Sequence, residues 1–172
     1  LGGNDAERAA ALFAIASTGA PEAAEILIDA ATAASFRRDP TGAVQALLLY
    51  AKKIGLSGEV KKMERIASQV IDASREQEAA SQRLAAMSVI AEVKGSDALG
   101  MLLEAADDPD LAIRGGVLRL AAGIPGSDVT KKWINRYAKV SDAAKPEILF
   151  MLGERGDELA VPLMMKALDD PS

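Results

Sequence analysis

Cysteine and histidine are both absent from this chain of 172 residues. Their absence excludes disulfides, thiol nucleophiles, imidazole bases and every metal site that depends on thiolate or imidazole ligands. No apolar run approaches the roughly 18 residues of a membrane span, so we expect no membrane insertion. The sequence therefore predicts no catalytic residue, no metal site and no cofactor.

Aromatic residues are scarce, at 3% of the chain, although apolar residues make up 49% of it. The apolar content is largely alanine and leucine, which rank highest in helix propensity. The β-branched and aromatic residues that favour strands are few by comparison. This composition predicts an all-α fold.

Positive charge is in deficit, because the net charge is −5 and the pI is near 4.9. An acidic chain lacks the general positive field that phosphate backbones require, so we expect no nucleic-acid partner. The densest basic stretch, residues 52–65, is interleaved with Glu59 and Glu64 and is typical of a solvated helix face.

Glycines recur at the ends of the expected helices, first at intervals of 39 and 37 residues and then at shorter ones. They stand at Gly19, Gly58, Gly95, Gly126 and Gly156. The last two intervals are 31 and 30 residues. Seven positions after four of these glycines stand Ile26, Leu102, Trp133 and Leu163. Such self-similarity predicts stacked helical hairpins that bury this register, Trp133 included, in a shared core.

We expect about five hairpins, at residues 5–35, 40–74, 77–107, 109–139 and 142–170, within one helical-repeat segment over 1–172. The Asp-Pro pair at 108–109 recurs at 170–171, two periods later, at the position of a turn within a repeat. We therefore expect this segment to be a piece of a longer protein.

The phrase from Asp108 to Arg114 reads DPDLAIR and places a turn aspartate six residues before an arginine. It resembles the turn-and-helix signature of HEAT repeats, and the short period resembles the compact HEAT-like class. The resemblance implies an α–α superhelix, a HEAT/armadillo-like solenoid. It also implies that Asp108 and Arg114 belong to a ladder between stacked repeats. Arg83 would belong to the same ladder, since it precedes Gly95 by the spacing that separates Arg114 from Gly126.

Residues 118–128 and 152–162 are similar to HEAT-like regions of secreted or periplasmic bacterial proteins, some of which precede a sugar-acting domain. This resemblance implies a periplasmic or secreted location. It also leaves open a role as the accessory helical region of a larger carbohydrate-active hydrolase or lyase.

Our first expectation for function is a non-catalytic scaffold that binds a protein partner on its second helices. Tyr137 occupies a register that Ala30, Ala106 and Ala167 hold elsewhere, so its ring is expected to project from the helix. Lys132 and Arg136 flank it on the same predicted helix. These three residues are the candidate partner-binding residues, and a purely structural spacer is the remaining alternative.

Overall fold

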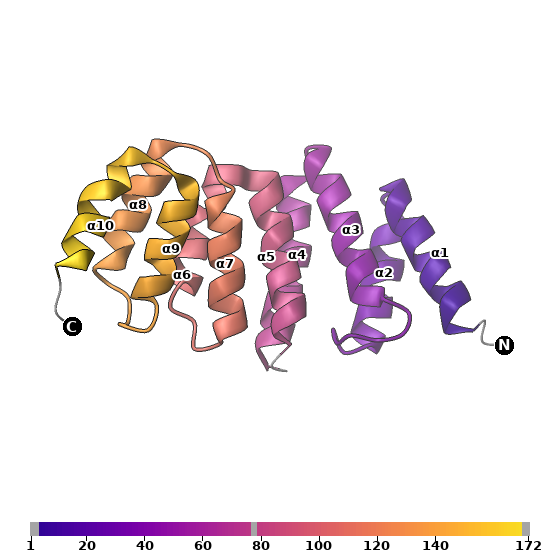
Figure 1. The fold of residues 1–172 in the computed structure, drawn as a ribbon. Coiled ribbons are helices and arrows are strands. Elements are labelled where there is room, and N and C mark those ends of the chain that lie inside the picture. The colour runs from indigo at the N-terminus through magenta and orange to yellow at the C-terminus, as the bar shows by residue number, and fades with distance from the viewer. Residues whose placement is uncertain (1–3, 77–78, 170–172) are drawn as a thin grey trace. The chain divides into compact units, whose positions relative to one another are not determined.

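The computed structural model describes residues 4–76 and 79–169, and every regular element within these ranges is helical (Figure 1). The elements are α1 (Asp5–Thr18), α2 (Ala23–Ala33), α3 (Ala43–Leu56), α4 (Val60–Glu76), α5 (Ala80–Lys94), η1 (Gly95–Ala98), α6 (Leu99–Ala105), α7 (Leu111–Ala122), α8 (Ser127–Tyr137), α9 (Lys145–Arg155), η2 (Glu158–Ala160) and α10 (Val161–Leu168). The predicted all-α fold is confirmed. The expected repeat limits at 77 and 170 and the Asp-Pro pair at 170–171 lie outside the described residues.

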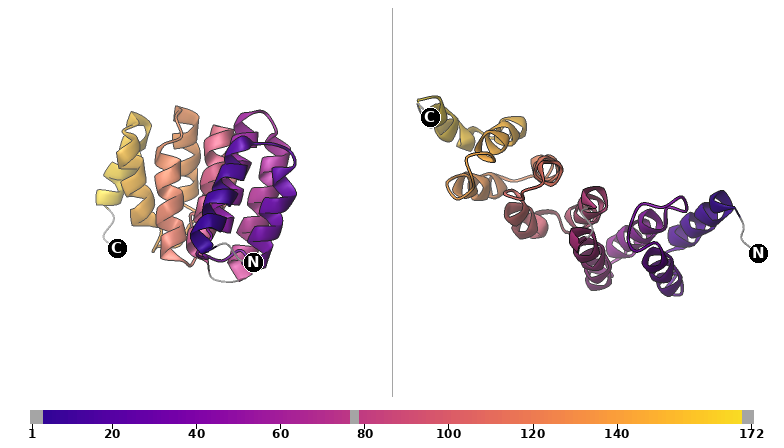
Figure 2. Two further views of the ribbon diagram at one scale, coloured as in Figure 1. Left: turned by 90° about the vertical axis from the view of Figure 1, so that its right-hand side faces the viewer. Right: turned by 90° about the horizontal axis from the view of Figure 1, so that it is seen from below.

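The chain divides into two compact units, Leu1–Lys94 and Gly95–Ser172. In the first unit α1, α3 and α5 form one layer, while α2 packs on α3 and α4 packs on α5. In the second unit α7 packs on α9, while α6 packs on α7 and α8 packs on α9. The right-hand view of Figure 2 looks along the helices and shows these layers end-on within each unit. Both units thus place each second helix against the first helix that follows it, as stacked hairpins require.

All five glycines predicted to end helices adopt a left-handed backbone, with φ between 56° and 107°. Gly19 illustrates the reason. It follows α1 with φ 69° and ψ 10°, and its amide donates to the carbonyl oxygen of Ala16. Residues with a side chain rarely adopt this conformation, and a Cβ at Gly19 would lie 3.1 Å from the Lys53 side chain. The glycine period therefore corresponds to the turns of the fold.

Side-chain caps fix the starts of several helices. The Oδ1 atom of Asn4 accepts from the amide of Glu7 at 2.9 Å, before the first turn of α1. The Oδ1 atom of Asp110 accepts from the amide of Ala112 at 2.7 Å at the start of α7. Each cap satisfies an amide that has no partner within its helix.

The predicted core register holds in the second unit and fails in α2. Leu102 and Trp133 are both 0% exposed, as expected, and Leu163 is half-buried. Ile26 is 50% exposed, so the prediction that it belongs to the core was wrong. The buried stripe of α2 consists of Ala23, Leu27 and Ala31. Two small alanines at this spacing let α2 approach α3 closely, and this rotates Ile26 out of the contact.

Candidate functional site

The arginine of the predicted ladder links two successive hairpins of the second unit. Arg114 lies in the first turn of α7, and its Nη1 donates to the main-chain oxygen of Asp108 at 2.9 Å. Its Nε and Nη2 donate to the two carboxylate oxygens of Glu147 on α9 at 3.2 and 3.1 Å. A forked pair of this kind fixes orientation as well as distance. The wider ladder, with Arg83 on α5 in the first unit, stays a prediction.

A second link joins the turns that precede α7 and α9. The Oδ1 atom of Asp107 accepts from the hydroxyl of Ser141 at 2.6 Å and from its amide at 3.2 Å. The Ser141 hydroxyl and amide together hold the pKa of the Asp107 carboxyl below its ordinary value. The contact of Asp107 with the following hairpin was not foreseen from the sequence.

The contact between Ser141 and Asp107 predicts how the free energy of unfolding changes with pH in the acid range. A carboxyl whose pKa is lowered by folding stabilises the fold fully above its unfolded pKa and loses that contribution as pH falls through the folded pKa. Ser141→Ala removes the hydroxyl donor and moves the pKa of Asp107 back toward its ordinary value. We expect the drop in unfolding free energy between about pH 6 and about pH 3 to become smaller in this variant.

Urea unfolding at several pH values measures this difference. Ser127→Ala is a matched control, because Ser127 is an exposed serine in the same unit whose hydroxyl makes no hydrogen bond within the described residues. If the unfolding free energy of Ser141→Ala fell with pH as steeply as that of the unmodified chain, the Ser141 hydroxyl would not set the protonation of Asp107.

A third link was not foreseen from the sequence. Arg155 ends α9, and its Nη1 donates to the main-chain oxygens of Ala121 at 2.7 Å and Ile124 at 2.6 Å. Its Nη2 reaches the carbonyl of Gly126 at 3.1 Å, and its Nε reaches the hydroxyl of buried Thr130 at 3.1 Å. Burial lowers the pKa of Arg155. Its guanidinium therefore holds the turn between α7 and α8 from the next hairpin along the chain.

Two of the three candidate partner-binding residues line a groove between α6 and α8. The groove has a volume of about 390 Å³. Its lining residues are Gly100, Leu103 and Glu104 from the α6 side, and Lys132, Asn135, Arg136 and Lys139 from the α8 side. Lys132 and Arg136 are thus brought together, with Asn135 and Lys139 as neighbours that the sequence did not single out. Tyr137 does not line the groove and is half-buried.

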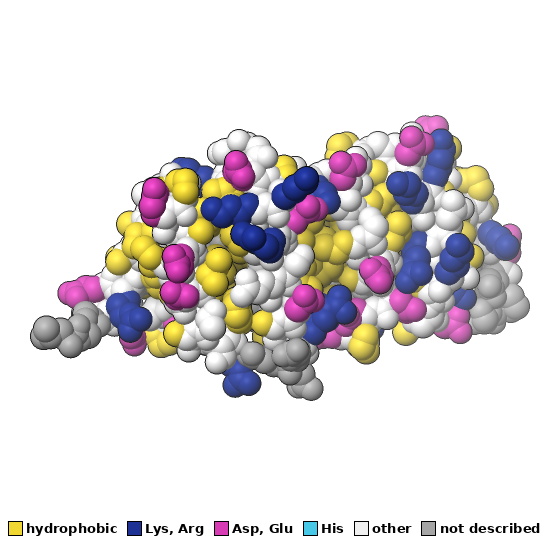
Figure 3. Space-filling view, turned by 180° about the vertical axis from the view of Figure 1, so that it is seen from behind, with side chains coloured by type: hydrophobic (Ala, Val, Ile, Leu, Met, Phe, Trp, Pro, Cys, Tyr) yellow, Lys and Arg dark blue, Asp and Glu magenta, His cyan; other side chains and the backbone are white. Residues whose placement is uncertain are grey.

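The cations of this groove differ in their contacts from their neighbour Lys131. Within the described residues, the side chains of Lys132 and Lys139 form no ion pair or hydrogen bond, and the buried Nε of Arg136 has no acceptor. The charge of Arg136 does act on Asp107, whose pKa it helps to lower. The neighbouring Lys131, by contrast, is paired with Asp128 at 3.1 Å. Figure 3 shows the face that carries α8 in the second unit, where Lys and Arg side chains gather.

Neither a cluster of metal-ligating side chains nor a membrane-spanning helix occurs in the described part of the chain. No group of three or more acidic side chains is placed to hold a metal ion among residues 4–76 and 79–169. In the same ranges no helix has both the length and the apolar composition for a membrane span.

Comparison with known proteins gave one family match. The family model of the PBS lyase HEAT-like repeat matches residues 7–32, which cover most of α1 and α2. No curated protein and no solved structure shows significant similarity to the chain. The match falls on the first helical hairpin, and both units repeat the packing of that hairpin along the chain. The first hairpin is therefore similar to a HEAT-like repeat, and the helical hairpins that follow it pack in the same way within each unit.

Proposed function

We propose that this chain is a non-catalytic interaction scaffold and that the groove between α6 and α8 binds an acidic segment of a partner protein. The observation that carries the proposal is the set of three cations that line one groove of a chain whose net charge is −5. In a chain rich in carboxylates, three neighbouring cations against the single carboxylate of Glu104 in the lining favour a surface that binds an external anion.

The lining of the groove suits an acidic peptide. Arginine binds carboxylates through a fork, and Lys132 and Lys139 add point charges beside it. Half-buried Leu103 offers an apolar contact next to the charges. Glu104 is the one carboxylate in the lining, so the groove retains a net positive charge.

Binding of a labelled acidic peptide tests the proposal. The probe is a peptide of about twelve residues in which aspartate and glutamate alternate with leucine and serine, followed by fluorescence anisotropy. We expect the double variant Lys132→Ala/Arg136→Ala to weaken binding by at least about tenfold, since it removes the half-buried arginine and one flanking charge. Tyr137→Ala in a separate variant reports whether the ring adds to the site.

Lys131→Ala is the matched control, because Lys131 lies on α8 and is already paired with Asp128. It should change the affinity by less than about twofold. Equal affinity in the double variant and the unmodified chain would remove the groove as the binding site. Binding of the probe should also weaken steeply as salt is raised, since exposed charges are screened.

A second candidate is the accessory helical region of a larger bacterial carbohydrate-active hydrolase or lyase. The observation in its favour is the description of the matched family, which includes a lyase. In that role the segment would hold the catalytic partner rather than supply reacting groups. Assay of the full-length native protein with and without the Lys132→Ala/Arg136→Ala substitutions separates the two roles. If the segment is only a scaffold, the variant loses assembly with its partner while the catalytic rate of the full-length protein stays unchanged.

A further inference from the structure

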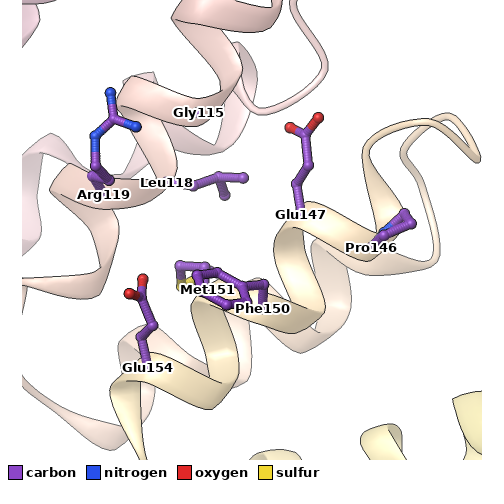
Figure 4. Close-up of a pocket in the computed structure, with 8 residues that line it drawn as sticks. All are labelled: Gly115, Leu118, Arg119, Pro146, Glu147, Phe150, Met151 and Glu154. Atoms are coloured by element: carbon purple, nitrogen blue, oxygen red, sulfur yellow. The ribbon is translucent and has the colours of Figure 1, made fainter.

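The opposite helix layer of the second unit carries a groove of different character, between α7 and α9. It has a volume of about 430 Å³. Its lining residues are Gly115, Leu118, Arg119, Pro146, Glu147, Phe150, Met151 and Glu154 (Figure 4). Leu118 and Met151 form an apolar floor and are 4% and 1% exposed. Phe150 stands at the rim with 71% of its surface exposed, which folding of the hairpins leaves unexplained.

The charges around this groove are of both signs. Glu147 is taken by Arg114 in the forked pair. Arg119 and Glu154 make no ion pair or hydrogen bond within the described part of the chain. The Nη1 atom of Arg119 lies 3.7 Å from an ideal Cβ at Gly115, so its guanidinium rests above the α7 wall. In Figure 4 Arg119 and Glu154 lie toward the end of the groove away from Pro146.

We propose that this groove binds an amphipathic helical segment of a partner protein, with one acidic and one basic residue beside its apolar anchors. The α9 wall runs from Pro146 to Glu154, a rise of roughly 12 Å, or about two helical turns. A helix of this length presents two large apolar residues four positions apart. These anchors cover Phe150 and the Leu118–Met151 floor, while the acidic residue meets Arg119 and the basic residue meets Glu154.

The groove between α7 and α9 differs from the groove between α6 and α8 in the kind of ligand that it would bind. There the lining carries three cations and one carboxylate, and the ligand is acidic. Here the two unpaired charges cancel, the floor is apolar, and the contact depends on shape and apolar area. The two sites share no residue, so each can be tested while the other is intact.

Selection from a displayed library of helical peptides of about twelve residues, randomised along one face, tests the proposal. We expect enriched peptides to carry two bulky apolar residues four positions apart with an acidic and a basic residue nearby. Phe150→Ala should weaken their binding by at least about tenfold, because the rim aromatic is the anchor contact. The double variant Arg119→Glu/Glu154→Lys should prefer peptides in which the two charges are exchanged.

Three controls keep the result specific. Leu111→Ala removes a side chain of the same helix that is 64% exposed outside the groove, and it should leave binding unchanged. Phe150→Ala should keep the melting midpoint, since its ring is largely exposed. Lys132→Ala/Arg136→Ala should bind the selected peptides with full affinity, which separates this site from the proposed acidic-segment site.

Three outcomes overturn the proposal. The first is a selection without enrichment, or with enriched peptides that lack the apolar pair. The second is undiminished binding to Phe150→Ala. The third is self-association of the free chain in sedimentation experiments that Phe150→Ala abolishes, because the groove would then hold a second copy. The exposed stripe of Val161, Met165 and Leu168 on α10 is the surface that such a copy would offer.

Discussion

Arg155→Met should lower the free energy of unfolding by about 3 kcal/mol, because it removes charge-assisted hydrogen bonds worth roughly 1.5–3 kcal/mol each from a partly exposed group. The guanidinium donates to the main-chain oxygens of Ala121, Ile124 and Gly126 and to the hydroxyl of Thr130. Methionine keeps an unbranched stem of similar length but offers no donor. The carbonyls at the end of α7 and in its following turn would lose the partner that now satisfies them.

Urea unfolding followed by circular dichroism measures this loss. Arg119→Met is the matched control, since Arg119 is exposed in the same unit, and its substitution should change stability by less than about 0.5 kcal/mol. Arg155→Lys should give an intermediate loss, because a compact ammonium group cannot reach several carbonyls as a planar fork does. If Arg155→Met unfolded at the same urea concentration as the unmodified chain, the hydrogen bonds of Arg155 would contribute nothing to stability.

Trp133→Ala should destabilise the chain by about 3–5 kcal/mol, since it empties a large fully buried site. The side chain is 0% exposed and stands first among the fully buried side chains by volume. It occupies the register that Leu102 holds in the preceding helix of the same layer. Trp133→Leu should therefore lose less than Trp133→Ala, because leucine is already accommodated at the equivalent position.

Phe150→Ala provides the matched aromatic truncation, because Phe150 is 71% exposed on the neighbouring helix of the same unit. We expect its unfolding midpoint to stay close to that of the unmodified chain. In the unmodified chain the single tryptophan should emit at short wavelength and resist quenching by iodide, as a buried indole does. Ready quenching, or a midpoint unchanged in Trp133→Ala, would contradict the assigned core.

The parts of the fold that were predictable follow from local rules repeated along the chain. Glycines with left-handed φ lie in the turns of the hairpins, and their spacing indicated the length of the repeat. Trp133 shares a register with Leu102, so its burial followed from the repeat. Lys132 and Arg136 lie four apart on α8, which places them on one face of the helix. Each of these inferences needed only sequence spacing and helix geometry.

Other features depend on partners that spacing does not reveal. Ile26 lies in a helix that is apolar on more than one side, so the pattern could not select which stripe contacts α3. The place of Tyr137 outside the groove depends on the rotation of α8 against α6. The exposure of Phe150 likewise depends on the packing of α9 against α7.

Arg155 was missed for a different reason, since its acceptors are main-chain oxygens that no residue type marks. The available signal was a basic residue directly before the glycine, a position that Lys94 also holds before Gly95. Basic residues in a last helical turn commonly bind terminal carbonyls, but here the carbonyls belong to the preceding hairpin.

This acceptor chemistry bears on how such a chain can lengthen by duplication. Arg155 stands 29 residues after Gly126 and 31 after Ile124, so donor and acceptors are separated by about one repeat. A duplicated repeat would carry its own arginine and would present a new turn to the arginine that follows. Every residue type offers the same backbone carbonyl, so later substitutions in that turn would keep these hydrogen bonds. The exposed side chains of the repeat could therefore diverge.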